Sequence, residues 1–297
     1  MNSAPLPSSP IPHFDLGSSG SPLHFLHANG YPPECYKPLL ELLQSEYNVF
    51  GMLLRPLWEN AKPEDIKDWR PFSEDLLHFL SSTQSAPVIG VGHSIGAIVT
   101  LRAALSDPAK FRALVLIEPV LFLPQRLIAW KLIRAIGLGY RLHPKIAGSL
   151  RRRRTFDDLD TVFRRYRNRE IFRYLRDENL HIYIEGITKP KNGRYELVFS
   201  PEWETRIYFT GLRDFDLWRE LPKLQVPMLF LRGAETDTFW EEAAELVKRK
   251  QPTARIETLD RSTHLLPLER PQEMFDIMQS FLKTLESETK ATRRPHA

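Results

Sequence analysis

Short apolar runs alternate with amphipathic runs along the first 119 residues of the chain. Apolar runs typical of buried strands recur along this stretch, at residues 23–27, 47–54, 87–92 and 113–117. Runs with an apolar stripe at helical spacing lie between them, at residues 34–45, 71–80 and 95–106. Strand, helix and strand in this order are typical of a parallel sheet with helices on both faces. We therefore predict an α/β fold with a mostly parallel central sheet.

The alternation stops after residue 119 and resumes after residue 213. The segment between has a mainly helical pattern, with one expected turn at Lys191-Asn192-Gly193. Strand patterns at 226–231 and 254–259 and helical patterns at 240–250 and 271–285 follow it. We expect five segments: a flexible arm at 1–20, a core at 21–119 and 214–285, an inserted basic helical block at 120–213, and a flexible tail at 286–297.

The charge of the chain is concentrated in the inserted block. The whole chain has 41 Lys and Arg against 37 Asp and Glu, whereas residues 120–213 alone have 20 against 10. A solvated helix surface is the ordinary explanation of such an excess. The functional alternatives are attraction of an anionic substrate and docking on an acidic lipid surface, so a peripheral membrane contact stays open.

Composition excludes several classes of protein and site. The single cysteine, Cys35, excludes an intrachain disulfide and a thiolate zinc site, so we expect no metal and no cofactor. No charge-free apolar stretch of about 18 residues is present, so no membrane-spanning helix is expected. The first residues lack the pattern of a secretory signal, and we expect a cytoplasmic protein. Arg and aromatic residues are interleaved near residue 164, but no nucleic-acid-binding motif accompanies them.

The clearest chemical signal is Gly92-His93-Ser94-Ile95-Gly96, between a strand pattern and a helical pattern. A G-x-S-x-G sequence in that context predicts a nucleophile elbow, a tight turn that exposes the serine hydroxyl. A Gly/Ser turn without chemistry is the plainer alternative. We expect Ser94 to be the nucleophile and His93 to pack or to contact substrate, because a base approaches the hydroxyl from the facing side.

A serine nucleophile needs an imidazole base and an acid that orients the imidazole. His264 follows the last predicted strand and precedes the last helix, at the sheet edge where ligand crevices form. The acid is open among three residues that follow strands. Asp237 is preferred because it follows the strand at 226–231, and Glu118 and Glu235 are the alternatives.

The oxyanion of the tetrahedral intermediate needs two backbone N–H donors. The residue after the nucleophile, Ile95, supplies one. The second is expected from His27-Ala28-Asn29-Gly30-Tyr31, where small residues let the backbone approach, and Asn29 is the candidate. Without the elbow, this segment reads as an ordinary Asn-Gly turn.

These motifs together resemble the α/β-hydrolase superfamily, over Pro22 to roughly Leu285, with the block at 120–213 in the place of its cap domain. The resemblance implies an α/β-hydrolase fold with an inserted helical cap. Ser94 stands where the epoxide hydrolase and haloalkane dehalogenase branches have Asp. Ala28 stands where many members have Gly, and Arg55-Pro56-Leu57-Trp58 replaces the more frequent Asp-x-Arg-Gly-x-Gly.

We therefore predict a serine hydrolase that cleaves a carboxylic ester or related acyl compound through an acyl-enzyme. The same machinery would serve a thioester, a lactone or a carbon–carbon bond. Apolar and aromatic side chains of the cap favour a hydrophobic or bulky small-molecule substrate, and the candidate pocket residues are His93, Phe122, Trp203 and Tyr208. The alternative is a non-catalytic or membrane-surface binding protein that docks through its basic cap. The oligomeric state stays open.

Overall fold

The protein is built around a seven-stranded sheet, in a computed structural model that describes residues 10–292, with side chains through residue 288. The order of its strands is β1-β3-β2-β4-β5-β9-β10, and all neighbours are parallel except β1 and β3. The strands of this sheet are β1 (His13–Gly17), β2 (Pro22–Leu26), β3 (Asn48–Met52), β4 (Val88–His93), β5 (Phe111–Ile117), β9 (Met228–Gly233) and β10 (Arg255–Leu259). The predicted α/β fold with a mostly parallel sheet is confirmed.

Helices cover both faces of the sheet, because alternate residues of each strand point to opposite faces and nearly all of them are apolar. Leu114 and Leu116 of β5 join one core cluster, and Val115 and Ile117 join the other. The helices of the core are α1 (Lys37–Gln44), α2 (Arg70–Thr83), α3 (Ile95–Ser106), α10 (Phe215–Glu220), α11 (Glu241–Lys250), α12 (Leu266–Glu269) and α13 (Pro271–Thr292). Helices α2, α3, α10 and α11 pack on the first face, and α1 and α13 on the second.

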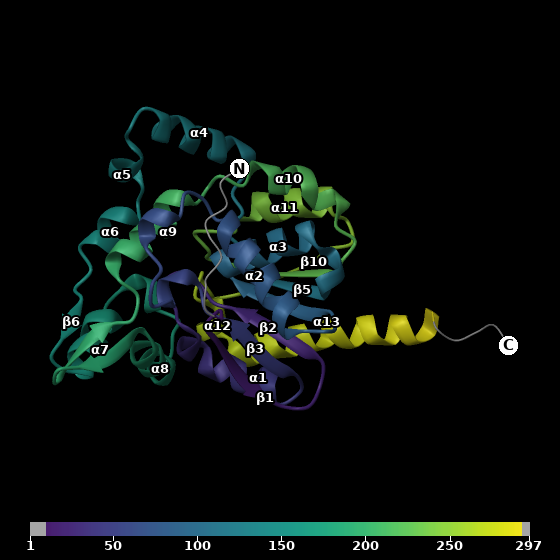
Figure 1. The fold of residues 1–297 in the computed structure, drawn as a ribbon, viewed down its shortest axis with the longest axis horizontal. Helices are drawn as coiled ribbons and strands as arrows, with labels where there is room; N and C mark the ends of the chain where they lie inside the picture. The colour runs from purple at the N-terminus through teal and green to yellow at the C-terminus, as the bar shows by residue number, and fades with distance from the viewer. Residues whose placement is uncertain (1–9, 293–297) are drawn as a thin grey trace.

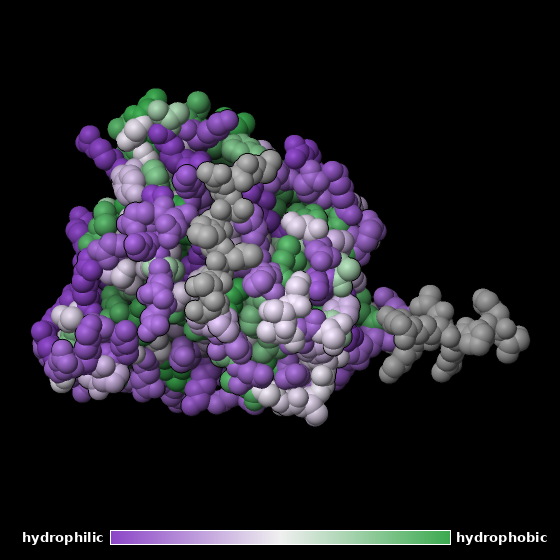
Figure 2. All heavy atoms as spheres, in the orientation of Figure 1, coloured by the Kyte–Doolittle hydropathy of each residue, from purple (hydrophilic) through white to green (hydrophobic). Residues whose placement is uncertain are grey.

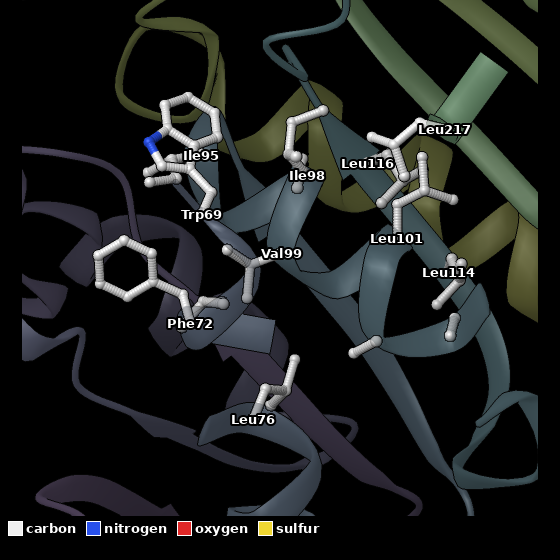
Figure 3. Packing of buried hydrophobic residues seen from close by; sticks show 14 of the residues in the cluster. Trp69, Phe72, Leu76, Ile95, Ile98, Val99, Leu101, Leu114, Leu116 and Leu217 are labelled. Carbon is white, nitrogen blue, oxygen red and sulfur yellow. The ribbon is translucent and has the colours of Figure 1, made fainter. Parts of the chain in front are cut away.

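The middle helix, α3, is apolar except at Thr100 and Arg102 in its interior, and it is buried from Ile95 to Ala104. Figure 3 shows Leu101 of α3 beside Leu114 and Leu116 of the sheet and Leu217 of α10. Since α3 begins one residue after β4, this packing fixes the turn between them.

The inserted segment lies over one end of the sheet (Figure 1). Its helices are α4 (Pro124–Ala135), α5 (Gly139–Leu142), α6 (Ile146–Leu150), α7 (Leu159–Arg167), α8 (Asp177–Ile187) and α9 (Pro201–Thr210). It also contains an antiparallel sheet that the helical pattern did not predict, of β6 (Thr155–Phe156), β8 (Arg194–Leu197) and β7 (Thr188–Lys191) in that order. The expected turn at Lys191-Asn192-Gly193 is confirmed, with positive φ at Asn192 and Gly193.

Both predicted flexible ends differ from the structure. Residues 13–17 of the expected arm form β1, which pairs with β3 at the edge of the sheet. The helix α13 continues through Thr292, so the first residues of the expected tail at 286–297 are helical. Residues 1–9 of the arm and 293–297 of the tail lie outside the described residues.

Short 3₁₀ turns complete the core. They are η1 (Pro33–Tyr36), η2 (Arg55–Leu57), η3 (Pro63–Asp65), η4 (Pro108–Lys110) and η6 (Leu221–Lys223), while η5 (Glu170–Phe172) belongs to the inserted segment. The inserted segment shares a core with the sheet domain, because Phe156, Tyr166 and Tyr183 join the same cluster as Tyr36. This shared core positions the insert above the carboxyl ends of the strands.

Candidate active site

The turn between β4 and α3 consists of one residue, Ser94, with φ of 58° and ψ of −118°. This conformation is unfavourable for a residue with a side chain, and such strain is concentrated at functional sites. The N–H of Ser94 donates to the carbonyl of Ile117 at 2.9 Å, so the strained backbone is tied to the neighbouring strand.

Two glycines make the turn sterically possible. A Cβ at Gly92 would lie 2.4 Å from the carbonyl oxygen of Gly96, and a Cβ at Gly96 would lie 2.3 Å from that of Leu26. Both contacts are with backbone atoms, which cannot move aside as a side chain can. The sequence signal G-x-S-x-G therefore reflects close backbone packing on both sides of Ser94.

The structure brings Ser94 and His264 together. The Oγ atom of Ser94 lies 2.9 Å from Nε2 of His264, and Nδ1 of His264 lies 3.2 Å from Oε2 of Glu118. Because an ionised carboxylate only accepts, Nδ1 carries the imidazole proton. The other ring nitrogen, Nε2, is then free to accept the hydroxyl proton of Ser94.

Glu118 follows β5 and is fully buried, with φ of 46°. Its Oε1 accepts from the N–H of Gly233 at 2.6 Å, and its Oε2 accepts from the hydroxyl of Thr236. The backbone N–H groups of Thr238 and Phe239 donate in turn to that hydroxyl, at 3.0 and 3.2 Å. The loop after β9 therefore holds the carboxylate that faces His264.

Asp237, the acid preferred from the sequence, makes different contacts. Its Oδ2 accepts from Nζ of Lys145 in the inserted segment at 2.8 Å, and its Oδ1 accepts from the hydroxyl of Thr238 at 2.8 Å. Its side chain is 59% exposed. Burial acts to raise the pKa of Asp237, but Lys145, His264 and Thr238 outweigh it and hold that pKa at about 2. The expected contact with His264 is therefore made by Glu118, the alternative acid, and not by Asp237.

Glu235, the other alternative, binds the inserted segment as well. Its two carboxylate oxygens accept from Arg173 at 2.6 Å and from the hydroxyl of Tyr174 at 2.5 Å. The hydrogen bond from Tyr174, and then that from Arg173, lowers the pKa of Glu235. The sequence could not separate these acids, because both β5 and β9 end beside His264 and all three residues follow those strands.

The expected oxyanion donors come from two segments, the start of α3 and the loop after β2. Ile95 is the first residue of α3, where the N–H groups have no carbonyl of the preceding turn to bind. Asn29 follows β2, and its side-chain N–H donates to the backbone carbonyl of Glu204 in α9 at 3.1 Å. A positive φ of 78° at Gly30 turns the chain back toward the insert. The side chain of Asn29 thus fixes the loop against α9.

His93 is buried in a directed chain of hydrogen bonds that the sequence did not indicate. Its Nε2 lies 2.9 Å from the carbonyl oxygen of His264, so Nε2 donates, and Nδ1 must accept from the hydroxyl of Tyr36 at 2.7 Å. The oxygen of Tyr36 accepts in turn from the N–H of Ala28 at 3.1 Å. Burial, and then the charge of His264, lower the pKa of His93 well below its usual value, which keeps it neutral. This chain connects the Asn29 loop to the backbone of His264.

A cavity of about 390 Å³ opens between the insert and the Asn29 loop. Tyr31 lines it from the core, and its ring lies 6.3 Å from that of His93. Tyrosines and cations of the insert form most of the rest of the lining, namely Lys145, Arg151, Arg152, Arg165, Tyr166, Arg169, Tyr183 and Tyr208. Glu204 is the carboxylate among the lining residues, and it pairs with Arg152 at 2.8 Å. The cavity is therefore aromatic and positively charged.

The four expected pocket residues are separated by the structure. Tyr208 lines the cavity, whereas His93 binds Tyr36 and His264 as described above. Trp203 is buried in the core, and the ring of Phe122 packs edge-on against Trp240 at 5.4 Å. A further cavity of about 410 Å³ is lined by residues of α3, η4 and the β9 approach. Neither Ser94 nor His264 is among the lining residues of either cavity, and Tyr31 of the Asn29 loop connects the cavity of about 390 Å³ with the site.

No group of three or more His, Cys, Asp or Glu within residues 10–292 is arranged to hold a metal ion. No helix among these residues is both long enough and apolar enough to cross a membrane.

Comparison with known proteins gives one family and many structural relatives. Residues 25–277 match the model of the alpha/beta hydrolase family. The uncharacterized hydrolase YugF of Bacillus subtilis (strain 168) is 24% identical over 259 residues, which cover 84% of this chain and 85% of the relative. Ethanol acetyltransferase 1 of Hanseniaspora uvarum is 24% identical over 282 residues, covering 89% and 80%.

Two solved structures illustrate the shared fold. E-2-(acetamidomethylene)succinate hydrolase superposes with a TM-score of 0.73 at 19% identity, covering 91% of this chain and 94% of its own. A carboxylesterase of the thaumarchaeon Nitrososphaera gargenis superposes with a TM-score of 0.67 at 20% identity, covering 96% and 100%.

Proposed function

This chain belongs to the alpha/beta hydrolase family, and we propose that it cleaves carboxylic esters by way of an acyl-enzyme on Ser94. The observation that carries the proposal is the continuous series of contacts from Ser94 Oγ to His264 and from His264 to Glu118. A nucleophile, a base and a group that orients the base are the parts that acyl transfer requires.

In the proposed reaction, Ser94 Oγ attacks the ester carbonyl carbon while its proton moves to Nε2 of His264. The imidazolium then gives this proton to the leaving alcohol, and the ester C–O bond breaks to leave the acyl-enzyme. Water repeats the sequence with His264 as base, which releases the acid and restores Ser94. The carboxylate of Glu118 stabilises the imidazolium through Nδ1.

The oxyanion would be held by the N–H groups of Ile95 and Asn29. Ile95 supports this role as the first residue of α3, where the helix dipole also favours negative charge. Asn29 supports it because its loop is fixed from two sides, by its own side chain on α9 and by Ala28 on Tyr36. Backbone donors fixed in this way need no reorganisation during the reaction.

We take the cavity of about 390 Å³ as the site for the part of the substrate remote from Ser94, because Tyr31 of the proposed oxyanion loop lines it. Its lining favours a substrate that is bulky and anionic. Tyr31, Tyr183 and Tyr208 offer flat apolar faces, whereas Arg165 and Arg169 offer positive charge. A carboxylate beside guanidinium groups gains charge-assisted hydrogen bonds that a neutral alkyl chain does not make. We therefore extend the proposal to esters whose acyl part carries a negative charge.

The first experiment uses a fluorophosphonate probe, which reacts only with an activated serine. Wild type is expected to be labelled, and both Ser94→Ala and His264→Ala are expected to lose labelling. Absence of labelling in a wild-type protein that is folded by circular dichroism would overturn the proposal and favour a binding protein of the same fold.

The charge preference is tested with a matched pair of aryl esters, 4-nitrophenyl butyrate and the 4-nitrophenyl monoester of succinate. The succinate ester is expected to have the higher kcat/KM, and Arg165→Gln is expected to reduce this value for succinate alone, by about tenfold. Arg164→Gln is the control, because Arg164 directly precedes Arg165 on α7 and does not line the cavity. Equal loss for both esters would refute the charge preference and leave the esterase proposal intact.

A further inference from the structure

An apolar stripe is exposed on the outer side of α4. Ile128, Leu132 and Ile136 are spaced four residues apart and are 53%, 62% and 69% exposed. Residues at this spacing lie on one side of a helix. The stripe therefore faces solvent along the whole length of α4.

The stripe continues over the next two helices. Tyr140 and Leu142 of α5 and Leu150 of α6 are 46%, 54% and 53% exposed. Beyond this segment, the only other exposed large hydrophobic side chains among the described residues are Leu16 and Ile171, each 37% exposed. Figure 2 shows hydrophobic atoms gathered at the top of the molecule, where Figure 1 places α4. Apolar surface that is concentrated in this way marks an interaction site. We call residues 124–151 the α4 surface.

The charge of the same segment has one sign. Residues 119–156 contain nine Lys and Arg and no Asp or Glu, so they hold nearly all the basic excess of the insert. Lys131 and Arg141 are exposed, and neither side chain has an ion pair or hydrogen bond with another described residue. Their charges remain available to an external partner.

The inner side of α4 is fixed to the protein. Leu127 and Trp130 are 3% and 7% exposed, and the guanidinium of Arg126 stacks over the ring of Trp240 at 3.6 Å. Arg134 donates to the carbonyl of Gly211 at 3.0 Å. These contacts hold the helix with its apolar stripe outward, so the stripe does not need an ordering step before it binds a partner.

We infer that the α4 surface binds the headgroup region of an anionic phospholipid bilayer. An amphipathic helix with bulky apolar residues on one side and cations beside them lies in the interface plane of such a membrane. Acidic headgroups complement Lys131 and Arg141, and the acyl boundary receives Ile128, Leu132 and Ile136. A second copy of this chain is a poorer partner, because two surfaces with unpaired cations and no carboxylate repel each other.

The inference is tested with the inactive Ser94→Ala variant, so that binding is measured apart from hydrolysis. Sedimentation with vesicles of equal parts phosphatidylcholine and phosphatidylglycerol is expected to bring down the protein, and pure phosphatidylcholine is not. Binding is expected to weaken strongly at an ionic strength of about 1 M, where charges are screened beyond roughly 3 Å.

Two sets of substitutions separate the apolar and ionic contributions. Replacing Ile128, Leu132 and Ile136 by Ser is expected to weaken binding at least about tenfold. Replacing Lys131 and Arg141 by Gln is expected to weaken it about 30-fold. The matched control replaces two exposed lysines outside the insert by Gln, namely Lys62 and Lys67.

Failure of wild type and of Ser94→Ala to bind anionic vesicles would overturn the inference, as would equal binding to phosphatidylcholine alone. Unchanged binding by either the serine variant or the glutamine variant would do the same. If sedimentation velocity instead showed a dimer that only the serine variant dissociates, the partner would be a second copy. None of the five substituted residues lines the cavity, so hydrolysis of a short soluble ester by both variants is expected to match wild type, and this test is independent of the proposed function.

Discussion

The sheet domain and the first helices of the inserted segment place charged side chains differently. In the sheet domain, Arg55 and Asp75 are buried together with two hydrogen bonds of 2.6 and 2.8 Å, and Glu118 is buried with three donors around it. In α4 and α5 of the insert, the side chains of Lys131 and Arg141 are exposed and unpaired among the described residues. Buried charges with fixed partners set geometry, whereas exposed charges without partners are free to meet ligands.

The largest expected effect comes from removing the acid that orients His264. Glu118→Gln is expected to lower kcat about 10³- to 10⁴-fold, the range found when the orienting acid of a serine triad becomes an amide. The amide oxygen would accept from Gly233, so its N–H would face Nδ1 of His264 and move the ring proton to Nε2. Ester turnover at saturating substrate measures the effect.

Asp237→Asn is the matched control, because Asp237 binds Lys145 in a pair that is 38% and 59% exposed. Loss of an exposed pair is worth at most about 1 kcal/mol, so a change of less than about fivefold is expected. If Asp237→Asn were the more damaging of the two, the orienting acid would come from the loop that contacts the insert.

Loss of one ion pair in each region should change the free energy of unfolding of the protein by very different amounts. Arg55→Met is expected to lower the free energy of unfolding by roughly 3–5 kcal/mol, because it leaves the fully buried Asp75 without its partner. Arg154→Met in the insert breaks a pair that is 58% and 50% exposed, and a loss below about 1 kcal/mol is expected. Urea unfolding measures both. Restored stability in Arg55→Met/Asp75→Leu would identify the unpaired carboxylate as the cause.

His93 gives the test of positioning at the site. His93→Phe removes the donor to the carbonyl of His264 and the acceptor for Tyr36, and kcat is expected to fall about 10- to 100-fold. Because His93 does not line the cavity, KM is expected to stay near the wild-type value. His93→Gln, whose amide can still donate, should recover part of kcat. A rise in KM with unchanged kcat would show a substrate contact instead.

Two buried histidines of the sheet domain make its stability depend on pH. Burial lowers the pKa of His24 to about 3 and that of His27 to about 4, below the ordinary value of 6.5. Below pH 6.5 the unfolded chain therefore binds more protons than the folded chain, so stability present above that pH is lost as pH falls toward 4. From pH 7 to pH 6 the expected loss is about 1 kcal/mol for the pair.

Denaturant unfolding at several pH values measures this slope. His24 accepts a hydrogen bond from the N–H of Met52 at 3.1 Å, so His24→Gln keeps an acceptor and removes one titrating group. His27, His93 and His143 also have lowered pKa values, so the slope of this variant is expected to be smaller than that of wild type by about a quarter between pH 6.5 and 5. An unchanged slope would exclude His24 as a source.

The sequence predicted the sheet domain because local patterns decide it. A few consecutive residues are enough to predict the apolar runs of β4, β5 and β9 and the G-x-S-x-G turn. The strand β1 was missed because an edge strand with one solvated face, His-Phe-Asp-Leu-Gly, has no continuous apolar run. The strand β7, Thr-Lys-Pro-Lys, has no apolar side chain at all and exists through its pairing with β8.

The orienting acid could not be chosen from local sequence. Glu118, Glu235 and Asp237 all follow strands that end beside His264, and their contacts depend on residues far along the chain. Asp237 meets Lys145, which is 92 positions away, and Glu235 meets Arg173, 62 positions away. The position of the insert in the fold decides which of these carboxylates bind its cations. The hydrogen bond between Tyr36 and His93 could not be predicted for the same reason, since 57 positions separate the two residues.

The single thiol of the chain lies where the two regions meet. Cys35 in η1 is 1% exposed, its Sγ contacts the carbonyl of Tyr183 in α8 at 3.6 Å, and a Cβ at Gly186 of α8 would lie 2.8 Å from that sulfur. Burial also raises the pKa of the thiol, so Cys35 is unreactive while α8 is packed against η1. Cys35 is the only cysteine of the sequence, so a thiol reagent labels the protein at one position. The rate of this labelling therefore measures how often α8 separates from the sheet domain.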